Sequence, residues 1–348
     1  MSDIGRRTLL SGIVAFTAAS PAWAQADWRQ LAVPLYGPQD FVKGYILGYA
    51  LPRARAWQAS CATLVQTLAG AGRSGDARLA WKAAALDWAA LAAVATGPLV
   101  RRRSARRVDF MPVRTALVLR AIEAAPAGEE AMDRIGSAAK GLGALEWLLW
   151  APAAPRHDAA RAFATEAARD MQREADAVAD AFAAQAEREM DDEAVVAAFA
   201  EILNQWIGGL EQLRMQRLVR PVEEARTRGA RAPLLLRPWS GIDAEERAVR
   251  WRALQATAVF AGTAAPARGQ GQQVPIETYL RGRGLNPLAD RLRAVTASAD
   301  RALRAASGNG PEAMLGAGRQ LSLAKLLAEA EVAPALEVRV GFSDADGD

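Results

Sequence analysis

Apolar residues recur every three or four positions along most of this 348-residue chain, which is the period of an α-helix. The clearest stretch, 157–190, contains no glycine or proline and is predicted to form one long helix. A second helix is predicted over 193–220, where Pro221 should stop it. The pair Gly208–Gly209 in its middle predicts a kink or a close approach to another helix. Its apolar stripe consists of Phe199, Leu203, Trp206, Leu210 and Leu213.

The rest of the pattern predicts a mainly α protein made of two packed helical bundles, with minimal strand content. A strand signal appears only at 336–342. The segment 226–238 is interrupted by Gly229, Pro233 and Pro238, which predicts a hinge between a first bundle region at 25–228 and a second at 229–348. Further helices are expected over 41–69, 75–95, 113–124, 136–149, a segment through Trp251 and Phe260, 287–306 and 313–330.

The first residues resemble an export signal. Arg6–Arg7 precede an apolar run at 8–19, and Ala22–Trp23–Ala24 matches an A-x-A cleavage site, so a signal peptide is predicted at 1–24 and a periplasmic location for the remainder. The paired arginines suit either general secretion or twin-arginine export. No later segment offers ~20 uninterrupted apolar residues, so no transmembrane helix is expected in the mature chain. Cys61 is the single cysteine, which excludes an intrachain disulfide and predicts a buried helical thiol.

The formal net charge of +4 is modest, and it becomes +3 without residues 1–24. One dense basic run occurs at 101–107, and such runs bind nucleic acid, anionic membranes or acidic polysaccharides. A solvated loop between helices is the favoured explanation of the run. Export would make nucleic acid an improbable partner.

The segment 140–150 reads KGLGALEWLLW. It resembles the signature of the imelysin family, the peptidase M75-like proteins, in which Gly-x-His-x-x-Glu is followed by an aromatic residue and two leucines. Gly141 and Glu146 match this signature, but Gly143 stands at the histidine position. Ordered similarities also occur at 81–88, 96–99, 107–114, 237–241 and 340–348. The resemblance implies a two-bundle helical fold and a periplasmic protein linked to iron acquisition, in a family described both as peptidase-like and as ligand-binding.

The departure at Gly143 weakens a metallopeptidase interpretation. A histidine and a glutamate three residues apart on a helix can share a metal ion, whereas glycine offers no ligand. His157 is the only histidine, and it follows Glu146 by eleven residues, or about 16 Å of helical rise, with Pro152 and Pro155 between them. It is expected on the surface at the start of a helix. No serine or cysteine triad is recognisable, so no catalytic residue is assigned.

A site built only from carboxylates remains open, because iron, calcium and magnesium accept oxygen ligands. The candidate metal ligands are Glu146, Asp87 and Asp109. Each has a structural alternative: Glu146 satisfied by an arginine or by backbone donors, Asp109 forming a turn, and Asp87 pairing with an arginine. The terminal aspartates within 344–348 lack the later glutamate of a calcium-binding loop.

An organic ligand site is the other possibility. Tryptophans and arginines can stack on and bind a planar or anionic ligand in a cleft between the bundles. The candidates are Glu146, Lys140, Arg114, Arg237 and Ser240. Ser240 and Asp243 also begin two overlapping capping sequences, which predict that Ser240 caps the following helix.

These observations favour an exported, non-catalytic binding or accessory protein associated with iron uptake. Its partner would be a small ligand, a metal or an envelope iron-uptake protein. The alternatives are a divergent M75-type metallopeptidase, an acidic polysaccharide-binding protein and a scaffold without a ligand. Iron or another divalent or trivalent cation is the cofactor to be tested.

Overall fold

The computed structural model describes residues 27–70 and 74–341, and within these ranges all regular structure is helical. The predicted signal peptide at 1–24 and the aspartates of 344–348 lie outside the described residues. The principal helices are α1 (Pro38–Tyr45), α2 (Leu51–Ala69), α3 (Ser74–Leu91), α8 (Gly141–Trp150), α9 (Asp158–Glu187), α10 (Asp192–Arg214), α12 (Asp243–Ala258), α14 (Asn286–Ala305) and α15 (Pro311–Leu327). Shorter helices are α4 (Pro98–Arg101), α5 (Ser104–Val108), α6 (Thr115–Ala124), α7 (Gly128–Asp133), α11 (Arg220–Thr227), α13 (Ile276–Gly282) and α16 (Ala333–Ala335).

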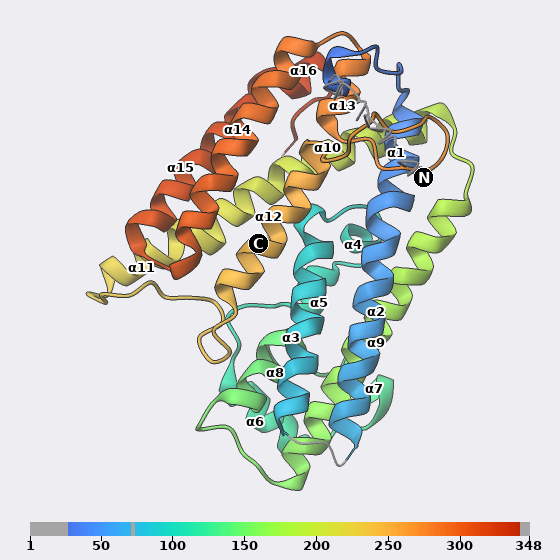
Figure 1. Ribbon diagram of the computed structural model, residues 1–348. Helices are drawn as coiled ribbons and strands as arrows, with labels where there is room; N and C mark the ends of the chain where they lie inside the picture. Colours follow the sequence, from blue (N-terminus) through green and yellow to red (C-terminus); the bar gives the residue numbers. More distant parts are fainter. Residues whose placement is uncertain (1–26, 71–73, 342–348) are drawn as a thin grey trace, which may run out of the picture.

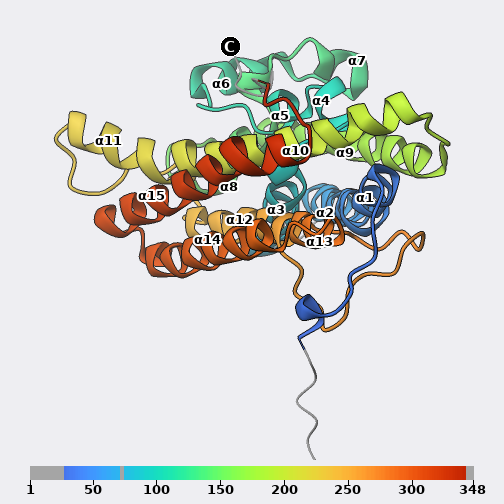
Figure 2. The ribbon, with the colours of Figure 1, turned by 90° about the horizontal axis from the view of Figure 1, so that it is seen from above.

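The helices form two groups that meet near the middle of an elongated molecule (Figure 1). In the first group α2 packs against α3 and α9, and α8 packs against both α3 and α9. In the second group α14 pairs with α15, while α10 and α12 connect them to the rest. Figure 2 shows α6 and α7 together on one side of α9. The predicted mainly α fold is therefore confirmed.

The contact between α12 and α3 joins the two groups. Helix α10 precedes residue 229 in sequence, yet it packs on α12 and α15, which follow that residue. Gly209 lies in this contact region, since a Cβ built on it would be 2.1 Å from the carbonyl oxygen of Ala93. The close helix approach predicted from Gly208–Gly209 is confirmed at this position. No helix in the two described ranges is long and apolar enough to cross a bilayer.

The prediction that Pro221 stops the second helix is wrong. A π-helical turn at Met215–Val219 follows α10, and α11 begins directly after it with Pro221 in its first turn. The same sequence of π turn and proline occurs at Ile46–Ala50 before Pro52. Proline removes a helical N–H donor and crowds the carbonyl of the preceding turn, and a π turn relieves this by changing the hydrogen-bond register.

The strand signal at 336–342 is not realised in its described part, which ends at Gly341. The side chain of Asn204 pairs with this segment instead: its amide nitrogen donates to the Arg339 carbonyl at 3.1 Å, and its oxygen accepts from the Gly341 N–H at 3.2 Å. An asparagine on α10 thus satisfies the backbone groups that a neighbouring strand would have paired. The apolar alternation at 336–342 reflects burial of Leu336 and Val338 against the core.

The basic run at 101–107 forms α4, a turn and α5 rather than a solvated loop. Arg102 donates to both carboxylate oxygens of the buried Glu174 on α9, at 3.0 and 2.8 Å. The hydroxyl of Ser104 donates to the same carboxylate at 2.6 Å, and Arg107 lies 3.6 Å from it. Part of the run therefore anchors this segment to α9.

Candidate functional site

A buried network of arginines and carboxylates lies where the two groups of helices meet. Its centre is Arg237, which is fully buried. Arg237 Nε donates to Glu246 Oε1 at 3.0 Å, and its Nη2 donates to Asp109 Oδ1 at 2.7 Å. Arg217 forms an ion pair with Glu246 and lies 3.6 Å from Asp109 Oδ2. Arg250 lies 3.9 Å from the same Asp109 oxygen.

Five separate segments supply this network. Asp109 follows α5, Glu146 lies on α8, Arg217 lies in the π turn after α10, Arg237 lies in the connection before α12, and Glu246 and Arg250 lie on α12. The connection turns tightly, because Gly241 adopts φ +71° and its N–H donates to the Arg237 carbonyl at 3.0 Å. This turn directs Ser240 towards α8.

Glu146 is fully buried on α8, and one of its oxygens is well satisfied. Glu146 Oε1 accepts from the Ser240 N–H at 2.8 Å, from the Ser240 hydroxyl at 2.7 Å and from the Trp239 N–H at 3.3 Å. Burial raises the pKa of Glu146, against the opposing effect of the Ser240 hydrogen bonds and the attraction of Arg237. The alternative in which backbone donors satisfy Glu146 therefore holds for Oε1.

The second oxygen is different. Within the described part of the chain, Glu146 Oε2 has no hydrogen-bond partner, and neither have Arg237 Nη1 and Arg250 Nε. Buried polar groups are nearly always paired, and an unpaired one costs about 1–3 kcal/mol. These atoms are therefore the strongest candidates in the network for contact with a bound molecule.

The carboxylates at the centre remain ionised. Burial alone would raise the pKa of Asp109, but the guanidinium groups of Arg237, Arg217 and Arg250 lower it below its ordinary value. The pKa of Glu246 is likewise lowered by Arg217 and Arg237, which outweigh its burial. Arg237 keeps its charge, because Asp109, Glu246 and Glu146 raise its pKa against the effect of burial.

The structure brings together three of the five predicted ligand-binding residues, namely Glu146, Arg237 and Ser240. Lys140 is buried elsewhere: its Nζ donates to the Met132 carbonyl at 2.8 Å and lies 2.9 Å from Asp170 Oδ2 on α9. Arg114 is exposed at the start of α6. Lys140 and Arg114 therefore do not converge on Glu146.

The predicted capping role of Ser240 is wrong. Helix α12 begins at Asp243 with Ile242 as its N-cap, and no side chain caps it. The Ser240 hydroxyl donates to Glu146 instead, while the Asp243 carboxylate accepts from the N–H groups of Leu236 and Arg237 at 3.0 and 3.1 Å. Tertiary hydrogen bonds have replaced the local capping pattern.

The three candidate metal ligands do not form one site. Asp109 is bound by Arg237, whereas Asp87 lies on α3, where burial raises the pKa of its carboxyl against the effect of Ser60. Among the residues that the structure describes, no three His, Cys, Asp or Glu side chains form a group that could hold a metal ion. The three arginines around Asp109 also repel a cation. A resident bare metal ion therefore does not fit this donor set.

Gly143 explains why the signature segment packs without a histidine. A Cβ built on Gly143 would lie 3.3 Å from Met111 Sδ and 3.5 Å from Val113 Cβ, so these side chains occupy the space in front of it. Gly141 lets the signature segment approach the end of α5. It has φ +77°, and a Cβ built on it would be 2.4 Å from the Val108 carbonyl oxygen. An imidazole at position 143 would require the 108–113 segment to move. His157 lies at the N-cap of α9, as predicted.

Sequence reasoning missed Arg217, Glu246 and Arg250. Two patterns in the sequence could have identified them. Arg217 follows Leu213 by four residues and so continues the apolar stripe of α10 with a charged residue. Asp243, Glu246 and Arg250 recur at three and four residues and place a charged stripe on the face of α12 that turns inward.

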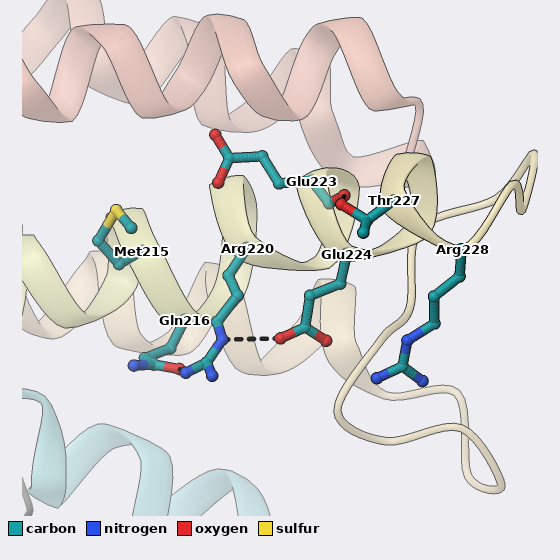
Figure 3. A pocket seen from close by; sticks show the side chains of 7 residues that line it. All are labelled: Met215, Gln216, Arg220, Glu223, Glu224, Thr227 and Arg228. Atoms are coloured by element: carbon teal, nitrogen blue, oxygen red, sulfur yellow. Dashed lines mark hydrogen bonds and ion pairs between the residues drawn. The ribbon is translucent and has the colours of Figure 1, made fainter.

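A surface groove runs beside the π turn that carries Arg217, but none of the network residues lines it. It encloses about 510 Å³ and runs along the π turn and α11 (Figure 3). Arg220 and Glu224 in it bind each other at 2.8 Å rather than pointing into free space. Its lining residues are Met215, Gln216, Arg220, Glu223, Glu224, Thr227 and Arg228.

A helical protein with a buried arginine–carboxylate network between two bundles is thus the class that fold and site define. The sequence model of the imelysin family, Peptidase_M75, matches residues 42–333, and the chain belongs to this family. No curated protein sequence matches it significantly.

Two solved structures share the fold. An imelysin-like protein from Psychrobacter arcticum 273-4 has a TM-score of 0.67 at 16% identity, covering 90% of this chain and 100% of that one. A putative iron-regulated protein A precursor from Parabacteroides distasonis ATCC 8503 has a TM-score of 0.66 at 13% identity, covering 84% of this chain and 93% of that one. At these identities the similarity is evidence of fold alone.

Proposed function

We propose that this chain is an exported, non-catalytic binding protein that serves iron uptake in the cell envelope. Membership of the imelysin family supports the proposal, as does the fold shared with a protein described as an iron-regulated precursor. The sequence at 1–24, with its paired arginines and A-x-A site, supports export. The ligand would bind between the bundles, beside Glu146, Arg237 and Ser240.

The observation that carries the binding role is the pair of unpartnered atoms Glu146 Oε2 and Arg237 Nη1. Both side chains are fully buried, and the pair includes an acceptor and a donor of opposite charge. A site that only stabilised the fold would be expected to satisfy both atoms internally. The packed space before Gly143 and the remote position of His157 support a role without catalysis.

Iron-limited growth tests the function. A strain lacking the gene is complemented with wild type, Glu146→Gln or Asp87→Asn, and growth is compared with the iron chelated and with iron added. We expect wild type and Asp87→Asn to restore growth under iron limitation, while Glu146→Gln does not, since Asp87 lies outside the network. Equal rescue by all three would reject this site as the source of the function.

Export and catalysis have separate tests. The intact mass of protein recovered from the periplasm should correspond to cleavage after Ala24, and an uncleaved cytoplasmic product would reject export. Proteolysis that a chelator abolishes would support the alternative, a divergent M75-type metallopeptidase, and would contradict the non-catalytic proposal.

A further inference from the structure

Helices α4 and α5 and the turn between them form a short hairpin, residues 98–108, with an inward and an outward face. The inward face is attached to α9, because Arg102 and the Ser104 hydroxyl both donate to the buried Glu174 carboxylate. The outward face carries three exposed arginines, namely Arg101, Arg103 and Arg106.

The three outward arginines have no partner in the described chain. Over residues 27–70 and 74–341, their side chains take part in no hydrogen bond or ion pair. Many exposed arginines on other helices bind a neighbouring carboxylate, as do Arg134, Arg161, Arg169, Arg220, Arg226 and Arg304. The charges of the outward face are therefore available to a molecule outside the chain.

Neighbouring carboxylates do not neutralise the hairpin. Segment 98–108 contains five arginines and no acidic residue. Within the described residues two carboxylates form ion pairs with it, Glu174 on α9 and Asp133 at the end of α7, and five minus two leaves +3. Glu201 on α10 accepts from the Gly97 N–H just before the hairpin, and counting it as well still leaves +2.

Other acidic residues near the hairpin are directed elsewhere. Asp109 follows it in sequence, but its carboxylate is buried and bound by Arg237. Asp170 on α9 is bound by Lys140. The exposed Asp180 on α9 forms no ion pair with the hairpin. The outward face is thus a region of net positive charge.

The turn between α4 and α5 does not select arginine for its conformation. Arg103 adopts φ 53° and ψ 41°, the left-handed region, which is unfavourable for a residue with a Cβ. Glycine would occupy this position with less strain. An unpaired arginine in a strained turn is therefore better explained by what its charge binds than by the fold.

The shape and composition of the hairpin limit the kind of partner. It lines neither the groove at α11 nor the cavity between α1 and the 267–274 loop, so neither hollow presents a ligand to it. Segment 98–108 contains no aromatic residue on which a sugar or a base would stack. Its exposed face has no large apolar side chain to insert into a bilayer core. Phosphate groups spread over a flat surface need only outward guanidinium groups.

We propose that the 98–108 hairpin binds the anionic phospholipid surface of the envelope membrane, with Arg101, Arg103 and Arg106 on lipid phosphate groups. The proposal goes beyond the ligand-binding function and rests on it only for export. Because the contact uses charge alone, it is peripheral and weakens as salt is added.

Vesicle sedimentation tests the proposal. Purified protein is mixed with vesicles of phosphatidylcholine alone, or of equal parts phosphatidylcholine and phosphatidylglycerol. We expect binding to the anionic vesicles at low salt, at least about tenfold tighter than to the neutral ones. This binding should be lost at about 1 M salt, where the Debye length falls to ~3 Å.

Two triple variants locate the contact. Arg101→Gln, Arg103→Gln and Arg106→Gln together should weaken binding roughly 100-fold, since each arginine near an anionic surface contributes about fivefold. The matched control removes the same charge and should change the affinity by less than about threefold. It replaces exposed arginines far from the hairpin in sequence with glutamine, namely Arg228, Arg231 and Arg252.

Arg103→Gly separates binding from folding. Glycine takes a positive φ without strain, so the thermal unfolding midpoint should not fall, whereas affinity for the anionic vesicles should fall about fivefold. A lowered midpoint with unchanged affinity would show that Arg103 serves the fold and would contradict the proposal. Circular dichroism confirms that the triple variants are folded.

Other results overturn the proposal in defined ways. No preference for anionic vesicles, or equal weakening by both triple variants, would reject the hairpin as a membrane contact. Tighter binding of polygalacturonate than of vesicles would make an acidic polysaccharide the partner instead. Binding that appears only in a variant ending at Gly341, which lacks the aspartates of 344–348, would assign the arginines to this chain's own acidic end. Iron-limited growth that depends on Glu146 is a separate result, so the two proposals can fail independently.

Discussion

Only one of the two carboxylate oxygens of Glu146 takes part in hydrogen bonds that hold the fold together. Its Oε1 accepts three hydrogen bonds that connect α8 to the turn at Trp239 and Ser240, while its Oε2 has no partner in the described residues. The motif around Glu146 was sufficient to name this residue as a candidate site residue. Its partners were not predictable from spacing, because they depend on where the 228–242 connection folds back.

The pH dependence of stability should report on Glu146. Burial raises its pKa in the folded protein, so the protonated form is favoured by folding. The stabilisation that protonated Glu146 contributes is fully present below the pKa of about 4.3 that glutamate has in the unfolded chain. It is lost as pH rises through the higher pKa of Glu146 in the folded protein. Glu146→Gln keeps the neutral form, so the stability of this variant relative to wild type should increase between about pH 4 and pH 7. Urea unfolding across this range measures the difference, and a flat difference would contradict the assignment.

Arg237 should be among the most sensitive positions. Arg237→Ala leaves Asp109 and Glu246 buried with reduced compensation, and loss of one partner from a buried ion pair costs about 3–5 kcal/mol. Arg226→Ala is the matched control, because Arg226 pairs with Glu312 on the surface and such pairs contribute about 0–1 kcal/mol. Denaturant unfolding of both variants measures the loss in the free energy of unfolding that each substitution causes. Similar losses would mean that the network does not stabilise the fold in this way.

At the scale of the helices, hydrophobic periodicity predicted the long elements well and their interruptions poorly. The predicted helix at 157–190 corresponds to α9, and the segment at 136–149 to α8 with a preceding 3-10 turn. The π turns before Pro52 and Pro221 were missed, because a period of 3.6 residues does not show a local change to a wider turn. A third π turn, Ala328–Val332, precedes Pro334 in the same manner.

Two glycines on helices should respond in opposite ways to alanine. In Gly209→Ala the new methyl group would meet the Ala93 carbonyl oxygen and Leu254, so α10 must move and the protein should lose about 1–3 kcal/mol. In Gly316→Ala on α15 the methyl group would meet only Arg319, at 3.7 Å, and the higher helix propensity of alanine should add about 0.5–1 kcal/mol. Thermal and urea unfolding measure both. A destabilised Gly316→Ala, or a neutral Gly209→Ala, would be inconsistent with this packing.

For the whole molecule, the sequence supported the helical class and the family, whereas the location of the site required the structure. Asp109, Glu146, Arg217, Arg237 and Glu246 are spread over more than a third of the chain, and no local pattern links them. The signature segment identified Glu146, and the ordered similarities at 107–114 and 237–241 contain Asp109 and Arg237. Charged positions that continue the buried faces of α10 and α12 identify Arg217 and Glu246 once the helices are placed.

The two groups of helices should unfold together. Helix α12 packs against α3 of the first group and α14 of the second, and the arginine network connects the same regions. Tryptophan fluorescence is weighted towards the first group, which contains Trp57, Trp81, Trp88, Trp147 and Trp150, whereas circular dichroism reports on all helices. We expect coincident transitions by the two probes. Two separated transitions would show that the groups are energetically independent.

The most direct test of the central claim measures metal binding by the purified protein. Elemental analysis of purified wild type and Glu146→Gln, with calorimetry of iron, zinc and calcium on both, decides whether the network holds a bare cation. The account predicts no stoichiometric metal in either protein, because three guanidinium groups surround Asp109. One equivalent of metal per chain in wild type, lost in Glu146→Gln, would contradict it.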